Sequence, residues 1–344
     1  MVGKPTFPLY RLPYVALKVA FDNSHPHDIL RLSMVSKKSY SICKVFRKKV
    51  KNLDIRFNCL SDICSDCMYT IFKVKSNSEV SATDSKLESL KIKDTVFQVK
   101  MDECIHTLNF YCNDRLACLT TLYEYLTDFY EVPLYGVELD GDSMRALDGV
   151  LARQQTLATC FFSCSKSGDE EARWFLDRVE NRVTQCLALN VKTSKNFRLN
   201  LRQPIKSDRF YFGGSHTLSF DDFSELNSRG LFAEKTSLTC ENLNSYLKNW
   251  INGGGNPNLG FLELGLNSIE VNTVLNDIEF IHRRHQNNVV IFVTDSFSWG
   301  FNESYEIRRN DGTIASVVMK NGQNCKFKLC VWPDVHGSVY PELE

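Results

Sequence analysis

The chain has 344 residues, which is long enough for about two domains and a sizeable hydrophobic core. Its 43% apolar and 24% charged residues are typical of a folded globular protein and unlike a disordered one. Lys plus Arg and Asp plus Glu both total 41, so the formal net charge is zero. This balance excludes an overall basic field for binding nucleic acid or an anionic membrane.

No apolar run reaches the roughly 18 residues that a membrane-spanning helix needs. The N-terminal residues lack the apolar core and cleavage site of a secretory signal. The 13 cysteines are therefore expected to be reduced thiols in the cytosol or the nucleus. Their odd number and scattered placement argue against a disulfide framework.

Residues 11–48, RLPYVALKVAFDNSHPHDILRLSMVSKKSYSICKVFRK, predict three short helices. Pro13 suits the first turn of the first helix, where its missing N–H costs nothing. Leu17, Ala20 and Phe21 then share one face of that helix. Pro26 interrupts this pattern, and a second helix follows.

In the second helix, Asp28 lies in the first turn, where a carboxylate favours the helix dipole. Ile29, Leu32 and Val35 recur at three-residue steps and predict its inner face. Ser36 can cap a third helix. The apolar face of that third helix is predicted to hold Tyr40, Cys43, Phe46 and Val50.

This segment resembles the F-box, which docks F-box proteins onto the Skp adaptor of a cullin ubiquitin ligase. The positions that the resemblance assigns to adaptor contact are Leu12, Pro13, Leu17, Phe21, Ile29, Leu32, Val35 and Ser36. Many F-boxes carry Trp where this chain has Ser39 or Tyr40, so part of the adaptor contact would be packed differently. In the alternative interpretation, the helices only cap a globular domain.

Residues 53–57, 68–75 and 95–100 alternate in polarity and predict strands, with a polar loop at 76–86. Residues 116–129 predict a helix. Its apolar side is expected to hold Leu119, Leu122, Tyr123, Leu126 and Phe129.

From about residue 130, short apolar pieces recur at intervals of about 22 to 28 residues, the range of leucine-rich-type repeats. These predicted strands are residues 137–139, 159–162, 187–189, 210–212, 236–238, 262–264 and 289–293. Predicted helices between them are residues 142–152, 169–183, 220–226, 240–251 and 271–285. Strand followed by helix, repeated, implies parallel neighbouring strands with helices outside. Because no strict leucine-rich ladder is present, we expect a degenerate βα array, with a closed or doubly wound α/β domain as the competing fold.

The C-terminal part changes to an antiparallel pattern. Residues 305–309 and 314–319 alternate around Asp311-Gly312 and predict a hairpin. Residues 325–332 predict a third strand of this antiparallel cap. The chain is thus expected to be α/β, or α+β overall, with a helical domain at 1–50 and an α/β, leucine-rich-repeat-like domain at 51–344.

Residues 243–266 and 305–317 resemble the F-box-associated domain of a large nematode family of F-box proteins. The first piece also has a physical explanation. Leu243, Leu247 and Trp250 share a helix face, Gly253 can take the left-handed C-terminal cap, and Pro257 blocks continuation of the helix.

Catalytic and metal-binding patterns are weak. Cys64 and Cys67 form a close pair without a second ligand pair, and His282 and His285 lie three apart on a predicted helix without a metalloprotease motif. The glycine-rich pieces fit turns, and no nucleophile elbow, kinase motif or deaminase motif occurs. We therefore expect no cofactor, no metal and no catalytic residues.

Together these features predict a non-catalytic substrate receptor of a Skp–cullin–F-box ubiquitin ligase in the cytosol or nucleus. Its partners would be a Skp-type adaptor, a cullin through that adaptor, and an unidentified target protein, without nucleic acid or membrane. One alternative is a stand-alone interaction scaffold whose helices only cap the βα domain. Another is an α/β hydrolase or transferase, which would need a deep pocket with convergent ionisable groups.

Overall fold

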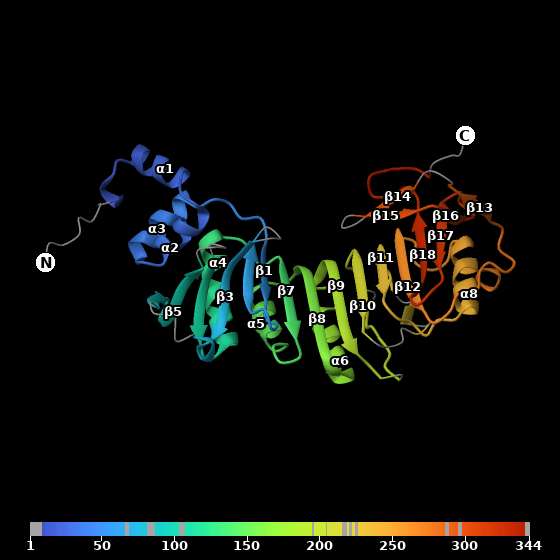
Figure 1. Cartoon of the computed structure of the whole chain (residues 1–344), viewed down its shortest axis with the longest axis horizontal. Coiled ribbons are helices and arrows are strands. Elements are labelled where there is room, and N and C mark those ends of the chain that lie inside the picture. Colours follow the sequence, from blue (N-terminus) through green and yellow to red (C-terminus); the bar gives the residue numbers. More distant parts are fainter. Residues whose placement is uncertain are drawn as a thin grey trace. The chain divides into compact units, whose positions relative to one another are not determined.

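The computed structural model describes residues 9–65, 69–80, 87–102, 107–194, 196–203, 205–214, 219, 222–223, 226–285, 289–294 and 298–340. These residues form two compact units, Met1–Val150 and Leu151–Glu344. The fold is mixed α/β, with an N-terminal helical region followed by a large sheet region (Figure 1). No helix in the described ranges is long and apolar enough to cross a membrane.

The first unit begins with a short 3-10 helix, η1 (Leu9–Arg11), and three α-helices, α1 (Tyr14–Asp22), α2 (Pro26–Ser33) and α3 (Lys37–Phe46). Pro13 precedes α1 in an extended conformation, as its fixed φ allows. Ser36 caps α3 by accepting a hydrogen bond from the Ser39 N–H at 3.1 Å. The three predicted helices are present, but α3 ends at Phe46, so Val50 does not lie on its apolar face as predicted.

The inner face of α2 differs from the predicted one. Ile29 is buried as expected, but Leu30 and Ser33 are the other buried residues of this helix. Leu32 is only partly covered, and Val35 is 71% exposed. The reason is that three-residue steps drift around a helix of 3.6 residues per turn, and that α2 has already ended at Ser33 before Val35 is reached.

The sheet of the first unit has the strand order β7-β1-β2-β3-β6-β5-β4. Its strands are β1 (Leu53–Arg56), β2 (Asp62–Ser65), β3 (Tyr69–Ser76), β4 (Glu88–Ile92), β5 (Thr95–Asp102), β6 (Thr107–Cys112) and β7 (Gly136–Asp140), with η2 (Asn77–Glu79) after β3. Helix α4 (Arg115–Tyr130) packs across β1, β2, β3, β4 and β6. All five residues predicted for the apolar side of α4 are buried.

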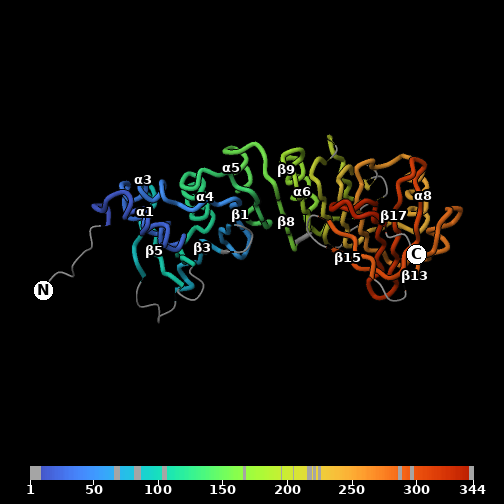
Figure 2. The backbone as a smooth tube through the Cα atoms, turned by 90° about the horizontal axis from the view of Figure 1, so that it is seen from above, coloured from blue at the N-terminus to red at the C-terminus, as the bar shows by residue number. Residues whose placement is uncertain are grey.

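The sheet of the second unit has the strand order β8-β9-β10-β11-β12-β18-β17-β16-β13. Its first five strands are parallel: β8 (Leu157–Ser167), β9 (Val183–Lys192), β10 (Arg209–Gly213), β11 (Gly230–Ala233) and β12 (Phe261–Leu266). Helix α5 (Ala146–Arg153) lies mostly in the first unit, and the helices of the second unit are α6 (Asp169–Val179), α8 (Cys240–Ile251) and α9 (Val271–Val274). In Figure 2, α6 and α8 lie on the same side of these strands. The predicted succession of parallel strands and covering helices is therefore present here.

The C-terminal strands are antiparallel, as predicted. Strands β16 (Glu303–Arg308) and β17 (Ile314–Lys320) form the hairpin, with Gly312 at φ +92° in the turn. Strand β18 (Cys325–Val331) pairs with β17 and joins it to β12. This places the antiparallel cap at the side of the parallel array.

Strands β14 (Val290–Val293) and β15 (Ser298–Phe301) form a separate two-stranded sheet. Its aromatic residues cover part of the main sheet, because Trp299 stacks on Phe261 at 3.6 Å between ring centroids and Phe292 packs against Trp332. Residues 289–293 were predicted as another strand of the parallel array. That prediction is wrong, because the strand pairs with a local hairpin partner instead.

Two further predictions are corrected. Residues 236–238 were predicted as a strand, but the strand of this region is β11, which ends before them. Thr236 and Leu238 are buried in the connection that follows β11. Of residues 271–285 only α9 is helical, and residues 281–284 form strand β13 (Ile281–Arg284) paired with β16. The predicted helix at 220–226 lies partly outside the described residues.

Candidate functional site

The interior of the three-helix bundle is built from side chains of all three helices. The rings of Phe21 and Phe46 stack at 5.0 Å between centroids. Leu17, Ile29 and Cys43 are also buried. Apolar burial of this kind supplies the main favourable term in folding. Leu17, Phe21 and Ile29, three of the eight residues predicted for adaptor contact, therefore stabilise the bundle from inside.

The other predicted contact residues lie nearer the surface. Pro13 is exposed at the entry to α1, and Leu12 is partly exposed beside it. Val35 is 71% exposed after the end of α2. Leu32 is partly exposed, and Ser36 caps α3. The predicted set is thus divided between the core and the surface of the bundle.

Leu32 and Val35 also line a groove of about 390 Å³ between α2 and the first sheet. Leu90 of β4, Val99 of β5 and Leu108 of β6 complete its apolar lining. The helices therefore leave an apolar recess where they meet the edge of the sheet.

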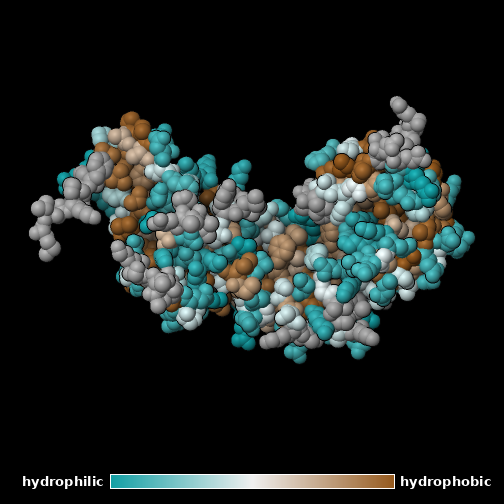
Figure 3. Space-filling model, in the orientation of Figure 1, coloured by the Kyte–Doolittle hydropathy of each residue, from teal (hydrophilic) through white to brown (hydrophobic). Residues whose placement is uncertain are grey.

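The outer surface of α1 carries apolar side chains that were not predicted as contacts. Val15 is 72% exposed and Val19 is 56% exposed, and their four-residue spacing puts them on one face. Tyr14 and Val45 are also mostly exposed. Figure 3 shows hydrophobic surface over the region that Figure 1 labels α1. The spacing of Val15 and Val19 opposite Leu17 was the signal in the sequence that could have identified this face.

Helix α3 packs against helix α4 through aromatic rings. Tyr40 lies edge-on to Tyr125 and to Phe129, with 5.6 Å between the ring centroids in each pair. Lys44 and Arg47 form ion pairs with Glu131 at 2.9 and 2.5 Å. The ring of Tyr40, one of the two residues at the position where Trp was expected, thus serves the contact with α4.

Burial at this junction shifts the pKa of several groups. It raises the pKa of the Cys43 thiol to about 11 and raises that of the Tyr125 hydroxyl as well. Hydrogen bonds from Lys44 and Arg47 lower the pKa of Glu131. The thiol and the phenol are therefore neutral at physiological pH, while the carboxylate is charged.

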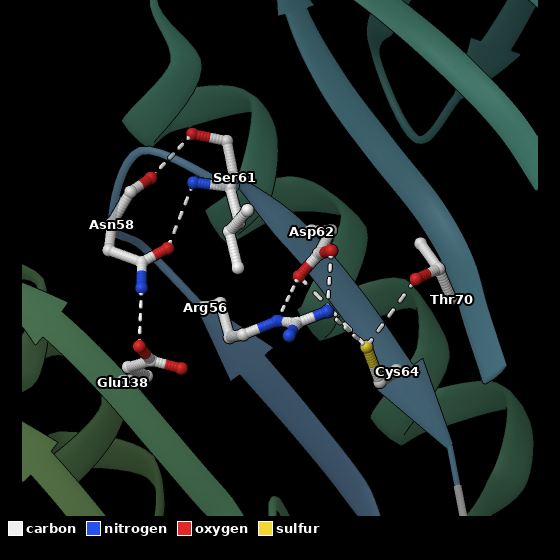
Figure 4. A network of polar contacts seen from close by, with 8 residues as sticks. Arg56, Asn58, Ser61, Asp62, Cys64, Thr70 and Glu138 are labelled. Atoms are coloured by element: carbon white, nitrogen blue, oxygen red, sulfur yellow. Dashed lines mark hydrogen bonds and ion pairs between the residues drawn. The ribbon is translucent and has the colours of Figure 1, made fainter. Parts of the chain in front are cut away.

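The face of the first sheet opposite α4 carries a row of charged side chains (Figure 4). Arg56 donates to both carboxylate oxygens of Asp62 at 2.5 and 2.7 Å and to Cys64 Sγ at 3.0 Å. Glu138, opposite Arg56 on β7, accepts from Asn58 at 2.5 Å, and burial raises its pKa. Because these groups satisfy one another, the network is suited to fixing the strands rather than to catalysis.

In the second unit, the face opposite α6 and α8 is more apolar. The strand register places Phe161, Ala188, Tyr211 and Phe232 side by side across β8, β9, β10 and β11. Phe161 is 40% exposed, which is unusual for a phenylalanine within a central strand. Figure 3 shows surface of intermediate to high hydrophobicity over the strands labelled β8 and β9 in Figure 1. Trp299 of β15 packs on Phe232 at one end of this row, so the part of the face open to another molecule lies over β8, β9 and β10.

Catalytic and metal-binding chemistry has little support among the described residues. They contain no group of three or more His, Cys, Asp or Glu side chains that could hold a metal ion. Cys67 lies outside them. His282 and His285 lie on and after strand β13 rather than on a helix, and His282 contacts Glu303 at 2.7 Å. Burial raises the pKa of Cys160 and Cys330, which disfavours their thiolates.

Comparison with protein families gives one match over the helical bundle and one within the second unit. The model of the F-box domain matches residues 9–51, which contain α1, α2 and α3. A second model, described as F-box associated, matches residues 196–264, which contain β10, β11, α8 and part of β12. Neither the curated proteins nor the solved structures contain a significant match. The two family matches are consistent with an F-box protein.

Proposed function

We propose that this chain, which carries an F-box domain and an F-box-associated domain, is the substrate-recognition subunit of a Skp–cullin–F-box ubiquitin ligase. The observation that carries the proposal is the F-box match over a three-helix bundle with an exposed apolar face on α1. F-box domains generally bind a Skp-type adaptor and, through it, a cullin. Residues 1–50 would serve as the docking domain and residues 51–344 as the domain that holds the target.

The proposed mechanism is proximity. Holding a target protein on the same assembly as the ubiquitin-loaded enzyme raises the effective concentration of its lysines without any acid or base from this chain. No catalytic family is indicated by the comparisons, which fits a receptor role. F-box proteins typically work in the cytosol or nucleus, and we propose the same location here.

The adaptor contact would use Leu12, Pro13, Val15, Val19 and Val35, whose side chains are at least partly exposed. Leu17, Phe21 and Ile29 would act indirectly, by holding the helices that present these residues. Leu32 and Ser36 lie at the junction of α2 and α3 and would fix the geometry of that turn.

Calorimetric titration with a purified Skp-type adaptor tests the proposal. Val15→Asp combined with Val19→Asp should weaken adaptor binding by about a hundredfold, because two carboxylates would be buried against an apolar surface. Leu12→Asp combined with Pro13→Ala should weaken it similarly. Val289→Asp, at an exposed apolar position of the second unit, is the matched control and should leave affinity unchanged. If the wild-type chain fails to bind the adaptor, the proposal is refuted.

A second candidate function is a stand-alone interaction scaffold whose helical bundle only caps the rest of the chain. The packing of Tyr40 on Tyr125 and Phe129 favours it, because the bundle covers apolar rings of α4. Deleting residues 1–50 would expose these rings under either hypothesis. The surface variants on α1 are therefore the decisive test, since they change adaptor contact without uncovering α4.

A further inference from the structure

The open face of the second sheet ends in a groove of about 550 Å³ at the carboxyl ends of β10, β11 and β12. Tyr211 and Phe232 lie in its lining, and two carboxylates, Glu234 and Glu263, face it from neighbouring strands. Ligands of parallel sheets commonly bind outside the carboxyl ends of the strands. The groove therefore continues the apolar face into a site with charged groups.

The two carboxylates differ in their partners. Glu263 is mostly buried and forms ion pairs with Lys326 and Lys328. Glu234 is exposed and accepts a hydrogen bond from the Tyr211 hydroxyl, and no basic residue in the described part of the chain forms an ion pair with it. Burial and the neighbouring carboxylate raise the pKa of Tyr211, so the phenol stays a donor. The Glu234 carboxylate is thus held by the Tyr211 hydroxyl and can still form an ion pair with a basic group of another molecule.

The position of Glu234 is fixed by the backbone around it. Its carbonyl oxygen would lie 1.7 Å from a Cβ atom on Gly265, so only glycine permits this close approach. The backbone N–H of Thr236 donates to the Gly265 carbonyl at 2.9 Å, just after Glu234. The carboxylate is therefore presented from a rigid strand end rather than from a free loop.

Phe161 marks the other end of the open face. Its aromatic ring, 40% exposed on β8, is an apolar anchor of the kind that dominates binding energy at protein interfaces. Ala188 lies between Phe161 and Tyr211 in the same row. The face thus presents one apolar and one anionic contact point.

We infer that this face binds an extended segment of the target protein with an apolar side chain on Phe161 and an Arg or Lys side chain on Glu234. The inference rests on the proposed receptor function and names the chemistry of its target. Phe161 and Glu234 are separated by three strand spacings of about 4.8 Å across the sheet and by two residues of about 3.4 Å along the strand. Because these displacements are at right angles, the two anchors lie roughly 16 Å apart. An extended chain covers that distance in about five residues. The apolar and basic residues of the target segment are therefore about five positions apart.

Selection from a displayed library of random short peptides against the full chain tests the inference. The wild-type chain should enrich peptides with an aliphatic or aromatic residue about five positions from Arg or Lys. Glu234→Lys should replace the basic preference with Asp or Glu, because the charge of the contact point is reversed. Glu170→Lys, at an exposed position on α6, is the matched control and should leave the enriched motif unchanged.

Affinity measurements on one enriched peptide test the apolar anchor. Phe161→Thr keeps a good strand former in β8 and should weaken binding about tenfold, whereas Phe280→Thr, at a similarly exposed ring, should not. Binding should also weaken at high salt because the ion pair with Glu234 is exposed.

Enrichment of acidic peptides by the wild type, or a motif unchanged by Glu234→Lys, would overturn the inference. The adaptor titration separates it from the proposed function. Adaptor binding without the peptide motif defeats this inference alone, whereas the peptide motif without adaptor binding defeats the ligase role alone.

Discussion

The side-chain oxygens of Ser33 and Tyr125 lie 2.6 Å apart in a buried contact that joins helix α2 to helix α4. Ser33 Oγ also lies 2.5 Å from the Leu30 carbonyl oxygen, which can only accept. The single hydroxyl proton of Ser33 is therefore donated to the Leu30 carbonyl oxygen, and the Tyr125 hydroxyl must donate to Ser33 Oγ. This assignment makes the two side chains unequal in their contribution to stability.

Ser33→Ala should destabilise the first unit by about 2 kcal/mol, since the buried Tyr125 hydroxyl would lose its acceptor. Tyr125→Phe should cost only about 1 kcal/mol. It removes the donor, and the Ser33 hydroxyl that remains still hydrogen-bonds to the Leu30 carbonyl oxygen. Urea unfolding followed by circular dichroism would measure both values. A larger loss for Tyr125→Phe would show that the donor assignment is wrong.

Glu306→Gln should destabilise the second unit by about 3 kcal/mol. Glu306 is only 2% exposed and pairs with Arg283 at 2.8 Å and Arg308 at 2.9 Å, so removing its charge leaves two guanidinium groups without their counter-ion. Glu303→Gln is the control on the same strand. Its carboxylate is half-exposed and pairs with His282 and Arg284, so its loss should cost less than about 1 kcal/mol. Equal losses in denaturant titrations would contradict this ranking.

Two glycine substitutions should have opposite effects on thermal stability. Gly265→Ala should lower stability by about 3 kcal/mol or more, because the new Cβ would collide with the Glu234 carbonyl. Gly149→Ala should raise it by about 0.5–1 kcal/mol, since no atom lies within 4 Å of the new Cβ in helix α5. Calorimetric scans of the two variants would show melting shifts of opposite sign, and a stabilising Gly265→Ala would disprove the close approach.

The stability of the helical bundle should fall between about pH 9 and about pH 11. Burial raises the pKa of Cys43 from 9.0 to about 11, so the folded state favours the neutral thiol. The stabilisation is fully present below the unfolded pKa and is lost as pH rises through the folded one, by up to about 2.7 kcal/mol. Cys43→Ala should show a shallower decline in this window, while Cys59→Ala, at an exposed thiol, should follow the wild type. Parallel pH curves for wild type and Cys43→Ala would exclude this origin.

Elements whose signals are local were predictable from the sequence. The hairpin around Asp311-Gly312 formed as expected because Gly312 supplies the positive φ that its turn requires. Helix α8 ends as expected, since Gly253 takes φ +81° and its N–H bonds the Trp250 carbonyl. Capping and turn chemistry involve neighbours in the chain, so they can be read without knowledge of the tertiary fold.

Elements decided by distant partners were not predictable. Val274, Leu275 and Ile278 do bury an apolar side, which supported a long helix. Asp277 instead takes φ +56°, and the residues that follow pair with the free edge of β16. Likewise, the exposed ring of Phe161 alternates with buried Phe162, and nothing in the local pattern shows that no helix covers it. Both outcomes depend on pairing and coverage by residues remote in sequence.

Helix α4 contributes side chains to two hydrophobic interiors, that of the first sheet and that of the helical bundle. Leu119 and Leu122 are buried in a helix that packs on the first sheet. Tyr125 and Phe129 contact rings and hydroxyls of the helical bundle. Recombination that exchanged residues 9–51 for the equivalent segment of a distant relative would bring in side chains unmatched to Tyr125 and Phe129. The helical bundle and α4 are therefore expected to be inherited together, as a single evolutionary module longer than the matched domain.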